Sequence, residues 1–142
     1  MKKVIFISPM YNAASHLPEL IESMKEQTNV NWKHMSTDDS FDVACELTPN
    51  DDHFQIIKNK EKRWALKNVI NVAREYQSDP NVIIANIDGD DALCNENTVE
   101  LLLNAYKDDK VETVWTAHSW DINGMNISRE LPAGINPYEF SW

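Results

Sequence analysis

The stretch VIIANIDGDDALCNENTVELLL (residues 82–103) places three aspartates within four positions, directly after an apolar run. Residues 82–87 are predicted to form a strand, because β-branched and apolar residues favour a buried extended chain. The apolar side chains of residues 99–106 recur at helical spacing, and Asn95 is the expected cap of that helix. Carboxylates in a loop between a strand and a helix predict a binding site in an α/β fold.

Strand and helix alternate along the rest of the chain as well. Further strands are predicted at residues 4–8, 32–37, 54–57 and 111–117, and further helices at residues 15–27, capped by Ser15, and 65–76. Residues 37–42 are predicted as an acidic turn and residues 121–128 as a hairpin around Asn123-Gly124. This alternation favours a mostly parallel sheet covered by helices on both faces. No repeat or linker divides the 142 residues, so a single domain is predicted.

The composition restricts the partners of the protein. Its net charge of −10 and its pI of 4.7 argue against binding to bare nucleic acid, because phosphate backbones require a basic face. A phosphate-bearing small ligand remains compatible if a metal ion bridges the two sets of anions. The first apolar run is too short for a signal peptide or a membrane span, and Cys45 and Cys94 are isolated. Free thiols and a cytoplasmic location are therefore expected.

Several common site types are excluded by the residue spacing. The chain has only three glycines, and none lies in the turn after the first strand, SPMYNAAS (residues 8–15), which excludes a dinucleotide fingerprint and a phosphate loop. The four histidines lack the spacing of a zinc site. His118 alone is kept as a candidate ligand, because it follows a predicted strand.

The acidic loop is best explained by a cation. Alternation along an extended chain would put Asp88 and Asp90 on the same side, and Gly89 would allow a tight bend and the close approach of a ligand. Two carboxylates suit a hard divalent ion such as Mn²⁺ or Mg²⁺, which keeps some waters and accepts phosphate oxygens. The alternative is structural: Asp90 or Asp91 caps a turn before the helix.

Four segments in this order resemble glycosyltransferase family 2, whose members have the GT-A fold and use nucleotide-sugar donors. The segments are VIFISPMYNAASHLPELIESMKEQT, WKHMSTDDSFD, NKEKRWALKNVINVA and IIANIDGDDAL, the last carrying an Asp-x-Asp motif. The resemblance covers residues 2–119 and implies a single Rossmann-like GT-A domain. Residues 1–119 would form its nucleotide-sugar-binding core, and residues 120–142 a short remnant of the acceptor-side region.

The resemblance also implies roles for residues after the first two strands. Pro9, Tyr11 and Asn12 would line the pocket for the base and ribose, with the Tyr11 ring as a flat apolar face. Asp38 or Asp39, with Asp39 preferred, would accept a hydrogen bond from the base, which favours uracil and hence a UDP-sugar. Plain packing of Tyr11 is the structural alternative.

Later residues would handle the phosphates and the metal. Arg63, helped by Lys67, would pair with phosphate charge, although Lys67 could equally be an ordinary solvated helix residue. Asp88 would contact the ribose or the metal, Asp90 would bind the metal directly, and Asp91 would orient the loop or the donor sugar. Mn²⁺ or Mg²⁺ is thus the expected cofactor.

The chain departs from the family pattern in two respects. Trp64 stands where glycine is common, which would make the approach to the diphosphate more closed. Inverting transfer needs a carboxylate to take the proton of the acceptor hydroxyl, and the candidates after the last predicted strand are Asp121, Glu130 and Glu139. The acceptor is unknown. The aromatic tail NPYEFSW (residues 136–142) is expected to pack against a second copy; the alternative is that it folds back over the donor cleft and forms an acceptor platform.

Two other functions compete with sugar transfer. A donor-binding or interaction module, with at most weak donor hydrolysis, is favoured by the few residues after the last predicted strand. A receiver-type phosphotransfer domain also uses an acidic pocket in a small α/β domain, but its paired acids follow the first strand. Here that strand ends in SPMYN (residues 8–12), which argues against a receiver.

Overall fold

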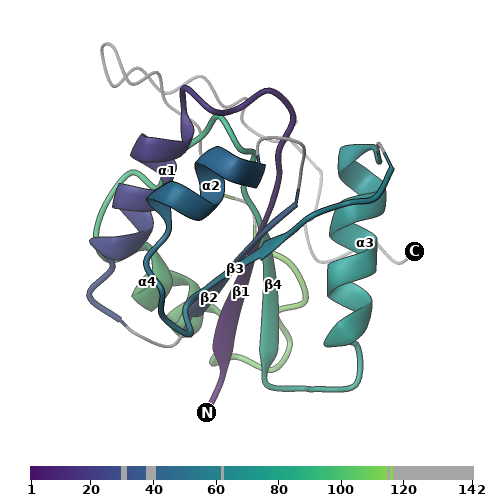
Figure 1. Cartoon of the computed structure of the whole chain (residues 1–142). Helices are drawn as coiled ribbons and strands as arrows, with labels where there is room; N and C mark the ends of the chain where they lie inside the picture. Colours follow the sequence, from purple (N-terminus) through teal and green to yellow (C-terminus); the bar gives the residue numbers. More distant parts are fainter. Residues whose placement is uncertain (30–31, 38–40, 62, 115, 117–142) are drawn as a thin grey trace, which may run out of the picture. The chain divides into compact units, whose positions relative to one another are not determined.

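The computed structural model describes residues 1–29, 32–37, 41–61, 63–114 and 116. Strands and helices alternate in the order β1 Lys3–Pro9, α1 Leu17–Lys25, β2 Trp32–Thr37, α2 Phe41–Leu47, β3 Phe54–Ile57, α3 Ala65–Glu75, β4 Val82–Asn86 and α4 Thr98–Ala105 (Figure 1). The chain forms two compact units, Met1–Val111 and Glu112–Trp142, and all of these elements belong to the first. The single-domain expectation stays a prediction.

The sheet of the first unit is parallel, as the sequence predicts, with the strand order β3-β2-β1-β4. Pro9 lies opposite Thr37, and Thr37 lies opposite Ile57, so three strands end level with one another. β4 ends at Asn86, opposite Ile7. The chain adds β2 and β3 on one side of β1 and then returns to its other side for β4. The strand order therefore reverses between β1 and β4.

Successive side chains of β1 point to opposite faces of the sheet. Ile5 and Ile7 are buried and form a core cluster with Val72 of α3. Phe6 is also buried and faces the opposite side, because successive side chains of a strand alternate. Figure 1 shows α3 on one side of the strands and α1, α2 and α4 on the other. Helices cover both faces, which is why residues 4–7 of β1 are all apolar rather than alternating with polar residues.

Burial on the helices follows their apolar periodicity. The apolar pattern predicts four inward side chains on each of α1 and α4: Leu17, Leu20, Ile21, Met24, Val99, Leu102, Leu103 and Tyr106. The four on α1 are buried, and of those predicted for α4, Val99 and Leu102 are buried. Both predicted caps are wrong. α1 begins after His16 because residues 13–16 already form a turn, and α4 begins after Asn97, whose backbone N–H donates to Asn95 Oδ1 at 2.9 Å.

Two further sequence predictions differ from the structure. Residues 41 and 42, predicted within an acidic turn, start helix α2, whose Ala44 is buried. This helix has seven residues, too few for its apolar spacing to be distinguished from a turn. Residues 111–114 and 116 lie in no strand, so the strand predicted at residues 111–117 is wrong for them. None of the described strands pairs with this segment, and an extended segment without a ladder partner is unstable. The hairpin predicted at residues 121–128 lies outside the described residues.

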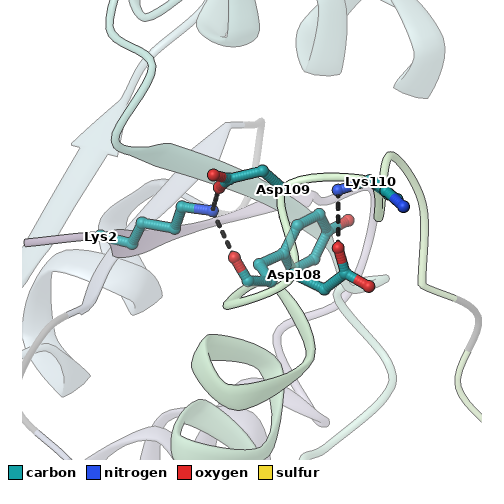
Figure 2. Close-up of polar contacts among 5 residues, drawn as sticks. Lys2, Asp108, Asp109 and Lys110 are labelled. Carbon is teal, nitrogen blue, oxygen red and sulfur yellow. Dashed lines mark hydrogen bonds and ion pairs between the residues drawn. The ribbon is translucent and has the colours of Figure 1, made fainter.

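The amino end of β1 is tied to the segment after α4 (Figure 2). Lys2 Nζ donates to the carbonyl of Tyr106 and lies 3.4 Å from Asp109 Oδ1. The backbone N–H of Lys110 donates to Asp108 Oδ1 at 3.0 Å and closes the turn. The Asp109 side chain is 96% exposed, so the ion pair contributes little stability. These contacts lie at the edge of the sheet opposite the carboxyl ends of the strands.

Candidate functional site

The loops after β1 and β4 meet where the strand order reverses. In open parallel sheets, ligands bind beyond the carboxyl ends of the strands at this switch point. Residues 10–16 follow β1 and residues 87–97 follow β4, and the second loop begins with the acidic stretch. Tertiary structure thus brings the predicted base-pocket loop and the predicted metal loop to neighbouring strands.

The acidic stretch forms a turn rather than a continuation of the strand. Ile87 N still donates to Ile7 O at 3.2 Å, and then Asp91 N donates to Asp88 O at 3.1 Å. Asp88, Asp90 and Asp91 are all exposed. The expectation that the Asp88 and Asp90 side chains point to the same side assumed an extended backbone. The backbone turns here instead, so alternation along the chain does not decide where these side chains point. The carboxylates project from a compact loop into solvent, where a cation could reach them.

Gly89 is the buried centre of this turn. A Cβ at this position would lie 2.9 Å from Met10 Cγ and 3.3 Å from Ala13 Cβ. The expected space for a ligand next to Gly89 is therefore filled by the loop after β1, and only glycine allows this close approach. The contact joins the acidic turn to the segment that carries Tyr11 and Asn12.

The β1 loop presents two of its three predicted binding residues at the surface. Pro9 is the buried last residue of β1, whereas Tyr11 is 65% exposed and Asn12 is also exposed. Asn12 has φ 56°, the one positive φ of a non-glycine residue in the described part of the chain. Asparagine tolerates this left-handed conformation better than most residues.

The basic residues lie at the start of α3, beyond the carboxyl end of β3. Arg63 and Lys67 are exposed, and Trp64, the residue preceding the helix, is 77% exposed. Asn68 is 4% exposed and accepts a hydrogen bond from Asn59 Nδ2 at 3.1 Å. This pair fixes the loop that carries Arg63 and Trp64. Sequence reasoning missed the role of Asn68, although an amide on the buried face of a helix is the signal for such a contact.

The donor set suits a metal ion only if a ligand completes it. Among the described residues, no group of three His, Cys, Asp or Glu side chains is arranged to hold a metal. Carboxylates from a single turn match a hard cation that takes its other ligands from water and phosphate. The remaining predicted site residues lie outside the described residues: Asp38, Asp39, His118, Asp121, Glu130 and Glu139. Cys45 and Cys94 are free and exposed, as expected.

Ser23 on α1 and two polar residues just after the end of α1, Gln27 and Thr28, hold the far half of the loop after β4, a role that sequence reasoning missed. Gln27 Nε2 donates to Asn95 O at 2.9 Å, and Leu93 N donates to Ser23 Oγ at 3.1 Å. Thr28 N donates to Glu96 O at 2.9 Å. The signal in the sequence was polar residues on the apolar face of an amphipathic helix.

Comparisons with solved structures support the fold. The chain resembles S. aureus TarS (residues 1–349) with a TM-score of 0.58 and 16% identity over 75% of this chain and 32% of that one. It resembles mannosyltransferase PcManGT from Pyrobaculum calidifontis, described in complex with GDP-Man and Mn²⁺, with a TM-score of 0.61 and 17% identity over 77% and 33%. The chain thus spans about a third of the length of each.

Sequence comparisons assign the family. Curated protein sequences give no match. In the described part of the chain, none of the helices has the length and apolar character needed to cross a membrane. The sequence model of glycosyl transferase family 2 matches residues 5–136, which include most of β1 and all of β4, α4 and the acidic turn. With this match over most of the chain, and with a parallel sheet shared with GT-A enzymes, the protein belongs to glycosyltransferase family 2.

Proposed function

We propose that the protein binds a nucleoside-diphosphate sugar together with Mn²⁺ or Mg²⁺ at the β1/β4 edge and transfers the sugar to an acceptor with inversion. The observation that carries this proposal is the exposed acidic turn at residues 88–91, packed through Gly89 against the β1 loop at the switch point. A cation on the acidic turn would therefore lie beside a nucleotide bound at the β1 loop. Family membership supports the reaction class.

The predicted site residues that the structure describes each have a chemical role in the proposal. When bound, the cation would neutralise the diphosphate and stabilise it as a leaving group. Asp90 and Asp88 would hold it, Asp91 would orient the donor sugar, and Arg63 would pair with phosphate charge. Tyr11 would offer its exposed ring to the base or ribose.

The remaining assignments are proposed from the sequence. Lys67 would assist Arg63, and Asp39, or else Asp38, would accept from uracil, so that UDP is the preferred nucleotide. PcManGT is described with GDP-Man, which makes GDP the alternative to test. One of Asp121, Glu130 and Glu139 would act as general base toward the acceptor. A cytoplasmic location and self-association through residues 136–142 also stay predictions.

Calorimetric titration of UDP, GDP and ADP, with and without Mn²⁺, tests the proposal. We expect metal-dependent binding that Asp90→Asn weakens by about 10- to 100-fold, since removal of one of few carboxylates leaves the cation poorly held. Asp52→Asn is the matched control, because Asp52 is also exposed but lies before β3, at the amino ends of the strands. Metal-independent binding, or equal losses in the two variants, would rule out the assigned metal position.

A transfer assay separates the enzyme from a module that only binds donor. The sugar of a radiolabelled UDP-sugar should be found on a saccharide acceptor, with the loss caused by Asp90→Asn matching its loss of donor binding. Donor bound without transfer to any acceptor in a panel of saccharides, with only slow release of free sugar, would favour the binding module instead.

A further inference from the structure

The loop after β4 is long and is held from two sides. It runs from residue 87 to residue 97 and has no helix or strand of its own. At its start, Gly89 packs against Met10 and Ala13. Its far half, residues 93–97, leads into α4 and lies against the end of α1. Only residues 90–92 separate the two anchored parts, and they include Asp90 and Asp91.

Both the nitrogen and the oxygen of the Gln27 carboxamide form hydrogen bonds at this contact. The side chain is 7% exposed, and Nε2 donates to Ser23 O at 3.0 Å and to Asn95 O at 2.9 Å. Oε1 accepts from Val99 N at 3.1 Å. Both donor hydrogens and the acceptor oxygen are therefore engaged, which fixes the orientation of the amide.

The bond to Val99 also caps α4. The first N–H groups of a helix lack intrahelical partners and need an outside acceptor. Asn97, the N-cap residue of α4, makes no side-chain cap hydrogen bond. Gln27, two residues after the end of α1, thus supplies the acceptor that the N-cap side chain does not provide.

Ser23 contacts Leu93, which is closer in sequence to the carboxylates than the loop residues that Gln27 and Thr28 contact. Its side chain is 9% exposed, and Oγ donates to Leu20 O at 2.8 Å while accepting from Leu93 N at 3.1 Å. Leu93 is two positions after Asp91. The hydroxyl is oriented by its own donation, so its lone pair is directed at the loop.

Thr28 and Asn29 extend the same contact along the loop. Thr28 Oγ1 lies 3.1 Å from Glu96 O and 3.2 Å from Asn97 Oδ1. Asn29 Nδ2 donates to Glu100 Oε2 at 2.7 Å. Thr28 and Asn97 are exposed, so these bonds compete with water and add less than the bonds of Ser23 and Gln27.

We propose that Ser23, on α1, and Gln27, just after its end, are positioning residues for the acidic turn, setting the place of Asp90 and Asp91 without touching the ligand. This inference rests on the proposed function for its consequence, since the turn matters only if it binds a metal–nucleotide complex. Residues that orient ligands from behind typically change metal affinity by about 10- to 100-fold when removed. The rigidity of the ligand-free loop is an independent consequence.

The variants separate positioning from general stability. Ser23→Ala removes the acceptor for Leu93 N, and Ser23→Thr restores a hydroxyl at the same place. Gln27→Met keeps a side chain of similar length but removes all of its hydrogen bonds. Ile21→Val is the matched control, because Ile21 is 3% exposed on the same helix and its side chain makes no hydrogen bond.

Hydrogen exchange of the ligand-free, full-length chain gives the first readout. We expect amides in residues 88–97 to exchange about tenfold faster in Ser23→Ala and Gln27→Met than in wild type, because buried hydrogen bonds are lost. Ser23→Thr should restore slow exchange, and Ile21→Val should leave these amides unchanged. Unchanged exchange in Ser23→Ala, or equal acceleration in Ile21→Val, overturns the proposal.

Calorimetry with UDP and Mn²⁺ gives the second readout. The Kd should rise about tenfold in Ser23→Ala and Gln27→Met and return toward the wild-type value in Ser23→Thr. Faster exchange with an unchanged Kd would show that these residues hold the loop but do not position the site, which contradicts the inference. If wild-type protein binds no nucleotide, the proposed function fails, and hydrogen exchange still tests the loop contacts. If Gln27→Met does not fold, the Ser23 pair decides.

Discussion

Replacing Gly89 with alanine should disturb the site through sterics alone. The added Cβ would lie 2.9 Å from Met10 Cγ, whereas carbon atoms pack best at about 3.5–4.0 Å. The shortfall is therefore about 0.6 Å (3.5 − 2.9) at that contact. Two further contacts, to Ala13 Cβ and Met10 Cβ, would each be 3.3 Å. The Met10 side chain is 4% exposed and cannot swing into solvent, so the acidic turn has to move.

The expected magnitude follows from overpacking. Forcing a methyl group into a filled interior costs about 1–3 kcal/mol, which urea denaturation followed by tryptophan fluorescence would detect as a lower midpoint. A displacement approaching 1 Å at a binding turn can cost about 100-fold in function. We therefore expect the Kd of UDP with Mn²⁺ to rise at least tenfold in Gly89→Ala, measured calorimetrically well below the melting temperature.

A double-mutant cycle identifies the cause. Met10→Ala removes the atom 2.9 Å from the new Cβ, although by itself it leaves a cavity and destabilises the protein by about 2–5 kcal/mol. If the Met10 side chain is the obstacle, Gly89→Ala should do less harm in the Met10→Ala background, with a coupling energy of about 0.5–3 kcal/mol. Strict additivity, or wild-type stability and affinity in Gly89→Ala alone, would refute the steric argument.

Three further outcomes are expected. Burial, and then the charge of Glu75, raises the pKa of Tyr76 above its ordinary value of 10.0, so the folded state keeps this proton to higher pH than the unfolded state does. The free energy of unfolding, measured by urea denaturation, should therefore be unaffected below about pH 10 and should fall above it. Tyr76→Phe should show a smaller fall. Val72→Ala should lower the unfolding free energy by about 2 kcal/mol, since it removes two buried methyl groups beside Ile5 and Ile7; an unchanged midpoint would contradict the assigned core. Asn12→Gly should preserve the fold, because glycine adopts the left-handed φ of 56° found at this position, while Asn12→Ala should lower the unfolding free energy by about 1–2 kcal/mol. Equal stability of the two variants would refute the conformational role. Calorimetry on Asn12→Gly then measures how much the Asn12 side chain contributes to nucleotide binding.

Local patterns in the sequence were enough for the elements that carry the site. Apolar runs of four to seven residues identified the strands to within about one residue, because extended and helical chains impose different periods on buried side chains. The same patterns placed the acidic stretch in the loop after β4. Prediction failed for the seven-residue helix α2, whose first residues the sequence predicts as a turn, and for the strand expected at residues 111–117 as far as these residues are described.

Pairing and contact were decided by tertiary structure. The strand order β3-β2-β1-β4 makes the β1 and β4 loops neighbours, which no local pattern specifies. Gly89 suggested room for a ligand, yet Met10 fills that room from a segment nearly 80 positions earlier (89 − 10). Gln27 reaches Asn95 across 68 positions. Periodicity reports which face of an element is buried, but the identity of its partner depends on which distant backbone atoms the completed fold brings within hydrogen-bonding distance.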